Sequence, residues 1–161
     1  GLIADAVVAP ADDLDVGAIH DRADVYADEL LALGAEMEET LAAVPDGRSL
    51  LVTDHDSFGY FADRHGFEVV GVVVPGGDTL ATPGAGSLSD LAAEVRAHDV
   101  PAIFTDDTVS PTLAEALAAE VGGHVEVVAL ATGSLSEPDG DAATYVAMMR
   151  TLAQRVASAL G

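Results

Sequence analysis

The chain has 161 residues and carries 28 acidic against 6 basic residues, which gives a formal net charge of −22. Such a polyanion is repelled by nucleic acid and by anionic membranes, so the charge excludes both as partners. There is no cysteine, which excludes disulfides, thiolate nucleophiles and Cys-ligated zinc sites. Half of the residues are hydrophobic, enough for a folded core. We interpret the acidity as the hydrated surface of a halophilic protein that also attracts cations.

The first part of the chain divides into a short segment and a long helix. Residues 1–16 hold an apolar run followed by Asp12, Asp13 and Asp15, without the basic start and small-residue cleavage site of a secretion signal. Residues 17–45 are expected to form one long amphipathic connecting helix that stops at Pro45-Asp46-Gly47. Its apolar side chains recur at three- and four-residue spacing: Ile19, Ala23, Tyr26, Leu30, Leu33, Met37 and Leu41.

Residues 46–161 alternate between strand-like and helical patterns and predict a single α/β domain. Strands are expected at 49–53, 68–74, 102–105 and 125–130, and helices at 57–65, 87–98, 110–121 and 142–160. Ser110 and Pro111 are expected to be the N-cap and the first helical residue of the third of these helices. The strands are apolar runs, which is typical of parallel sheets. We therefore predict a parallel four-stranded sheet flanked by helices on both faces and preceded by the long helix.

Polar residues follow three of the predicted strands, at the edge where parallel sheets bind ligands. They are Asp54-His55-Asp56, Asp106-Asp107 and Thr132-Gly133-Ser134. A neutral imidazole at His55 suits a metal ion, and the adjacent carboxylates can orient its other ring nitrogen. As an alternative, Asp54, Asp106 and Asp107 hold magnesium in a stand-alone regulatory or enzymatic domain.

Common catalytic and phosphate-binding motifs are absent from the chain. It contains no G-x-S-x-G and no G-x-G-x-x-G after a strand, and without lysine it cannot contain a P-loop. The histidines other than His55 lie on helices, at helix ends or in a turn, and we interpret them as structural. The motifs therefore argue against a hydrolase or a nucleotide-binding enzyme.

Four segments together resemble the substrate-binding proteins of zinc and manganese ABC transporters. The stretch V-T-D-H-D-S-F-G-Y-F-A-D-R-H-G-F, residues 52–67, resembles the signature of their second lobe. The others are I-F-T-D-D-T-V-S-P-T-L-A-E-A-L-A-A-E-V-G (103–122), T-Y-V-A-M-M-R (144–150) and Y-A-D-E-L (26–30), the last on the helix that joins two lobes. The resemblance implies a non-enzymatic, extracytoplasmic protein that captures zinc or manganese and delivers it to a membrane permease.

The resemblance also implies a set of metal ligands. His55 takes the position of the second-lobe histidine ligand. The family often places a carboxylate in the loop after the fourth strand as T-D-S, but this chain has Thr132-Gly133-Ser134. Glu137 or Asp139 of the same loop then substitutes, or a water does, or metal binding is weakened. A lobe that has lost metal binding and keeps a protein-contact role is the alternative.

The match covers only the connecting helix and the second lobe of that family. We therefore expect the first lobe, with its two histidine ligands, to be missing from this chain. Zinc sites need about four ligands, so metal binding by this chain alone is expected to be weak. A helix that packs on two lobes exposes an apolar strip when one is absent, and we expect the chain to self-associate through it.

Overall fold

The computed structural model describes residues 15–74 and 85–161. The predicted segment 1–16 therefore lies almost wholly outside the described residues, as does most of the loop after Val74. In chain order the elements are α2 (Val16–Leu41), β1 (Leu50–His55), α3 (Gly59–His65), β2 (Glu68–Val74), α4 (Ala85–Ala97), β3 (Ala102–Asp106), α5 (Thr112–Val121), β4 (Glu126–Leu130) and α6 (Tyr145–Leu160). None of the described helices has the length and apolar character needed to span a bilayer.

The chain divides into two compact units, Gly1–Glu36 and Met37–Gly161. The described part of the first unit is mostly the start of helix α2, whose apolar spacing produces the helix that the sequence predicts. Several of its large apolar side chains are exposed, among them Val25 at 69% and Leu31 at 74%. The second unit holds the sheet, the other helices and every predicted site residue.

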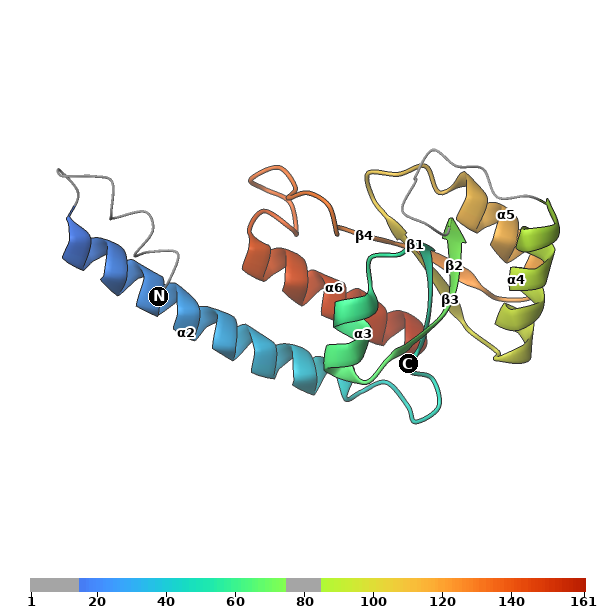
Figure 1. Ribbon diagram of the computed structural model, residues 1–161, viewed down its shortest axis with the longest axis horizontal. Helices are drawn as coiled ribbons and strands as arrows, with labels where there is room; N and C mark the ends of the chain where they lie inside the picture. Colours follow the sequence, from blue (N-terminus) through green and yellow to red (C-terminus); the bar gives the residue numbers. More distant parts are fainter. Residues whose placement is uncertain (1–14, 75–84) are drawn as a thin grey trace. The chain divides into compact units, whose positions relative to one another are not determined.

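The sheet of the second unit has four parallel strands in the order β2-β1-β3-β4. The chain runs from β1 outward to β2, then crosses back over β1 to β3 and continues to β4. Because parallel crossovers share one hand, this reversal places α3 on one face and α4 and α5 on the other. Figure 1 shows this arrangement, with α6 on the side of α3. The predicted α/β fold, with its four-stranded parallel sheet and long preceding helix, is confirmed.

The core on one face of the sheet lies under α4 and α5. Its members are buried aliphatic side chains: Val52, Val73, Val74, Ala92, Val95, Val100, Ile103, Ala114 and Leu117. Gly71 permits this packing, because a Cβ at that position would collide with the Leu91 side chain of α4. The register between β1 and β2 shifts by one residue beside Gly71, between Leu51 and Val52.

Most element boundaries differ from the predicted ones by a few residues. The long helix, expected to reach residue 45, ends at Leu41. Strand β1 runs two residues further than expected, to His55, because His55 pairs with Val74 of β2. Helix α5 begins at Thr112 with Pro111 as the N-cap, so the prediction that Ser110 caps it was wrong by one residue. Helix α6 begins at Tyr145, where the Thr144 hydroxyl accepts a hydrogen bond from the Ala147 N–H at 3.1 Å. Thr144 is the residue type preferred at an N-cap.

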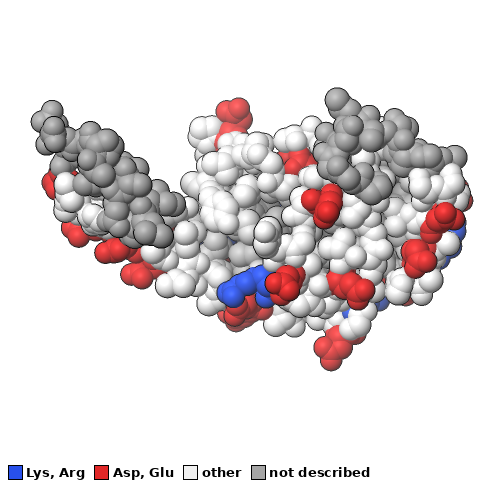
Figure 2. All heavy atoms as spheres, viewed as in Figure 1, with Lys and Arg blue, Asp and Glu red and all other residues white. Residues whose placement is uncertain are grey.

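Acidic side chains occur at separate places over the face of the molecule drawn in Figure 2. Basic side chains pair with some of them in the second unit. Arg64 lies 3.0 Å from Glu38, and Arg155 lies 2.6 Å from Asp141 while also donating to the Ala129 carbonyl at 2.8 Å. Exposed pairs of this kind contribute little to stability. The excess negative charge therefore remains as a field that attracts cations.

Candidate metal centre

His55 is the last residue of β1, at the point where the strand order reverses. Its backbone pairs with Val74 of β2, and its carbonyl accepts hydrogen bonds from the Thr53 hydroxyl and the Ser57 N–H, both at 3.0 Å. These bonds hold the backbone as the chain leaves the sheet. The His55 side chain is 22% exposed, so the imidazole is held by the protein and still meets solvent. Ligands of open parallel sheets bind at this switch point.

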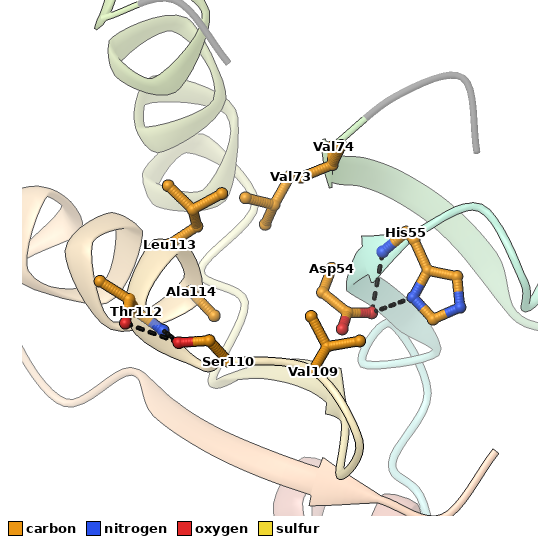
Figure 3. Close-up of a pocket in the computed structure, with 9 residues that line it drawn as sticks. All are labelled: Asp54, His55, Val73, Val74, Val109, Ser110, Thr112, Leu113 and Ala114. Atoms are coloured by element: carbon orange, nitrogen blue, oxygen red, sulfur yellow. Dashed lines mark hydrogen bonds and ion pairs between the residues drawn. The ribbon is translucent and has the colours of Figure 1, made fainter. Parts of the chain in front are cut away.

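Asp54 connects His55 to the neighbouring strand. Its Oδ1 accepts a hydrogen bond from the His55 N–H at 2.8 Å and lies 2.6 Å from Nδ1 of the His55 ring. Its Oδ2 accepts a hydrogen bond from the Asp106 N–H of β3 at 2.8 Å. Figure 3 shows the carboxylate between the ring and Val109, with the second ring nitrogen turned away from it. Asp54 is therefore held from two strands.

Asp106 holds the ends of β3 and β4 together. Its Oδ1 accepts hydrogen bonds from the Thr108 N–H, at 2.7 Å, and from the Thr108 hydroxyl, and its Oδ2 accepts one from the Thr132 hydroxyl. Burial alone raises the pKa of Asp106, but these hydrogen bonds and the nearby His55 lower it below its ordinary value. Asp106 is therefore a buried, charged carboxylate that joins β3 to the loop after β4.

The loop after β4 carries the remaining predicted site residues. Glu137 and Asp139 are both exposed. A Cβ on Gly133 would lie 3.3 Å from Oδ2 of Asp106. Position 133 therefore lies next to the Asp106 carboxylate but has no side chain of its own. Residues 15–74 and 85–161 contain no group of three His, Cys, Asp or Glu side chains placed to hold a metal ion. The structure therefore does not bring His55, Glu137 and Asp139 together as a closed site.

The same finding applies to the alternative magnesium site. Asp54, Asp106 and Asp107 do not form a metal-holding group in the described part of the chain. The oxygens of Asp54 and Asp106 already accept N–H and O–H donors, while the Asp107 N–H donates to the Leu130 carbonyl at 2.9 Å. These two carboxylates stabilise the ends of the strands, so the expected magnesium cluster is not assembled.

His55 lines one of the hollows in the second unit, and a larger hollow lies between two helices of the same unit. The first, about 130 Å³, is lined by Asp54, His55, Val73, Val74, Val109, Ser110, Thr112, Leu113 and Ala114 (Figure 3). The second, about 610 Å³, lies between α3 and α6, and its lining includes Phe58, Tyr60, His65, Met148 and Met149. His65 contributes a buried Nδ1 without a hydrogen-bond partner, and burial together with Arg64 lowers the pKa of this histidine.

Sequence reasoning missed the hydrogen bonds that join Asp54 to Asp106 and Asp106 to Thr132. The three residues come from the ends of three different strands and are 26 or more positions apart in the chain. Only the strand order brings them together. All three residues lie at or just after the carboxyl ends of predicted strands, so the sequence predicts that they collect at one edge of the sheet. It does not predict which of their atoms form hydrogen bonds.

Comparisons with known proteins agree on one family. The family model described as "Zinc-uptake complex component A periplasmic" (ZnuA) matches residues 2–159. The zinc-binding protein TroA of Treponema pallidum is 33% identical over 86% of this chain and 46% of its own length. The manganese-binding lipoprotein MntA of Bacillus subtilis is 26% identical over 89% of this chain and 47% of its own length.

A solved structure of the periplasmic zinc-binding protein TroA from Treponema pallidum has the same fold. It superimposes with a TM-score of 0.80 at 30% identity, over 89% of this chain and 52% of that structure. The chain thus spans about half the length of the relatives it matches. It belongs to the ZnuA family, the periplasmic A components of zinc-uptake complexes, which are binding proteins for transport and not enzymes.

Proposed function

We propose that this chain is one metal-binding lobe of the solute-binding component of a zinc or manganese ABC importer. The observation that carries the proposal is His55, a partly exposed imidazole at the switch point of the sheet, with one ring nitrogen beside Asp54 and the other turned away from it. A neutral imidazole nitrogen that faces open space is the usual protein ligand for zinc.

The remaining ligands come from two sources in this proposal. Glu137 or Asp139 reaches the ion from the loop after β4, or a water takes that position. Both side chains are exposed, so either can change its conformation without breaking a core contact. The other histidine ligands belong to a first lobe outside this sequence, and helix α2 connects the two lobes. Because the described residues lack a closed group of three ligands, this chain alone binds the ion weakly.

The identity of the ion follows from the ligand set. Imidazole ligands favour zinc, whereas an added carboxylate and a water move the preference toward manganese. The relatives are named for zinc and for manganese, which fits a site with both imidazole and oxygen ligands. The net charge of −22 supports capture by concentrating cations around the protein.

We place the protein outside the cytoplasmic membrane, where it delivers the ion to an ABC permease. The support is the family, whose description is that of a periplasmic uptake component. The exposed Val25 and Leu31 of α2 support one further contact, self-association through this helix when the first lobe is absent. Sedimentation at high and low salt tests that contact, and a monomer under both conditions would contradict it.

Gly133 favours a second candidate function, that of a lobe which has lost metal binding and acts through protein contact. In this alternative the absent side chain at position 133 marks a lost ligand. A Cβ built on Gly133 would lie 3.3 Å from an Asp106 oxygen, and this chain has no side chain there. The two candidates differ in one measurable property, the response of the chain to zinc and manganese.

Calorimetric titration of zinc and of manganese into the chain tests the proposed function. We expect weak, saturable binding that disappears in His55→Ala, because the strongest ligand of this lobe is then lost. His124→Ala is the matched control, since His124 is an exposed histidine in a turn distant in sequence from the site. Equal binding by the chain and by His55→Ala would contradict the assignment of His55, and no binding by any variant would favour the protein-contact function.

A further inference from the structure

We infer that Asp54 is a positioning residue which fixes the tautomer of His55, so that Nε2 carries the free lone pair. The first step concerns the two carboxyl oxygens of Asp54. Its Oδ1 accepts a hydrogen bond from the backbone N–H of His55, and its Oδ2 accepts one from the backbone N–H of Asp106, both at 2.8 Å. A backbone N–H can only donate, so both oxygens of Asp54 are acceptors in these hydrogen bonds.

The second step concerns the ring. Nδ1 of His55 lies 2.6 Å from Oδ1 of Asp54, a distance that requires a proton between the two atoms. Because the carboxylate is an acceptor, the proton is on Nδ1. In a neutral imidazole only one nitrogen carries hydrogen, so Nε2 then has an unshared electron pair. Figure 3 shows that Nε2 is the nitrogen turned away from Asp54.

The third step concerns rigidity. Asp54 cannot rotate freely, because its Oδ2 is held by the backbone of β3 while its Oδ1 contacts His55. Asp106, whose N–H makes that bond, is itself held through its side chain by Thr108 and Thr132. The orientation of the ring on β1 therefore depends on a chain of hydrogen bonds that reaches the loop after β4. A carboxylate that holds a metal-binding imidazole in this way typically increases the metal affinity of the site by 10- to 100-fold.

The role of Nε2 toward a metal rests on the proposed function, but the tautomer does not. The first measurement is therefore made without metal, on the ¹⁵N-labelled full chain at about pH 9, where ordinary histidines are neutral. Two-bond proton–nitrogen spectra distinguish the two tautomers, and the spectrum of His55→Gln identifies the His55 signals among those of the five histidines. We expect a protonated Nδ1 and a bare Nε2. A protonated Nε2 in the unaltered chain would overturn the inference, whether or not metal binds.

The variant Asp54→Asn then tests the cause. An amide offers one oxygen and one NH₂ donor, so it cannot accept the three N–H groups that meet the carboxylate. We expect the protonated-Nδ1 form to decline in this variant and to persist in Asp56→Asn. Asp56 follows His55 in the sequence and is exposed. Its replacement by asparagine changes the net charge by the same amount as Asp54→Asn. Equal tautomer populations in both variants would overturn the inference.

Zinc titration of the same samples separates this inference from the proposed function. If both hold, zinc shifts the His55 Nε2 signal, and Asp54→Asn binds about 10- to 100-fold more weakly than Asp56→Asn. If zinc leaves His55 unmoved in the unaltered chain, the proposed function fails, while the tautomer measurement still decides the role of Asp54. If the tautomer is right but Asp54→Asn binds zinc as tightly as Asp56→Asn, the positioning role is overturned.

Discussion

The carboxylates at the ends of β1 and β3 differ from those in the loop after β4 in what already binds them. Asp54 and Asp106 are buried and accept hydrogen bonds from backbone N–H groups at 2.7–2.8 Å. Glu137 and Asp139 are exposed on a loop. The carboxylates of the first pair already accept hydrogen bonds from the protein, whereas those of the second pair can approach an ion. The availability of a carboxylate to a metal is therefore decided by its partners more than by its distance in sequence from a histidine.

The largest expected effect is the loss of stability when one of the two buried carboxylates, that of Asp106, is removed. Asp106→Ala leaves the Thr108 N–H and the Thr108 and Thr132 hydroxyls without their acceptor, and we expect a loss of about 3 kcal/mol in the free energy of unfolding. Asp139→Ala removes the same charge from the exposed loop and should change it by less than about 0.5 kcal/mol. Urea denaturation of the two variants measures the difference, and equal midpoints would remove the distinction between the two regions.

A carboxylate added between the two regions gives the next largest effect. In Gly133→Asp the new side chain begins 3.3 Å from the Asp106 oxygen, at the position where the family resemblance expects a ligand. We expect zinc or manganese to bind about tenfold more tightly, because an added charged ligand near the ion contributes about 1 kcal/mol or more. The metal-free variant should be less stable, because two carboxylates then repel each other.

Gly133→Asn is the matched control for this substitution, since it has almost the same size and no charge. Calorimetric titration of both variants measures the effect, with urea denaturation of the metal-free proteins alongside. Equal metal affinities for Gly133→Asp and Gly133→Asn would mean that position 133 does not face the ion.

The smallest expected effect is that of Thr132→Val, which removes one hydrogen bond between the loop and Asp106. We expect a loss of about 1 kcal/mol near neutral pH. The pKa of Asp106 lies below its ordinary value of 3.8, so its contribution to stability is present above that pH and is lost as the pH falls through the lower folded-state pKa. The variant raises that pKa toward the ordinary value, so the two proteins should become equally stable in acid.

Urea denaturation at several pH values between about 7 and 2 checks this prediction. Thr151→Val is a useful comparison, because the Thr151 hydroxyl donates to a backbone carbonyl, that of Asp141 at 2.9 Å, and so has no carboxylate partner. Its cost should not depend on pH in the same range. A cost of Thr132→Val that stays constant down to pH 2 would contradict the role of its hydroxyl at the Asp106 carboxylate.

The fold was largely predictable because its signals are local. Apolar runs separated by amphipathic segments specify parallel strands with crossover helices, and strand β2 was predicted with its bounds unchanged at 68–74. Errors concentrated at element ends, where tertiary pairing decides. His55 was expected just after a strand, and its pairing with Val74 makes it part of β1. The N-cap of α5 moved from Ser110 to Pro111.

The sequence by itself determined the residue types of the site and the edge of the sheet at which they collect. His55, the acidic residues beside it and the missing carboxylate at Gly133 can all be identified from the sequence alone. Only the tertiary structure decided which carboxylates are already engaged. Asp54 meets Asp106, and Asp106 meets Thr132, because the order β2-β1-β3-β4 places the ends of β1, β3 and β4 side by side. Hydrogen bonds act over about 3 Å, and strand order is a non-local property that no short motif encodes.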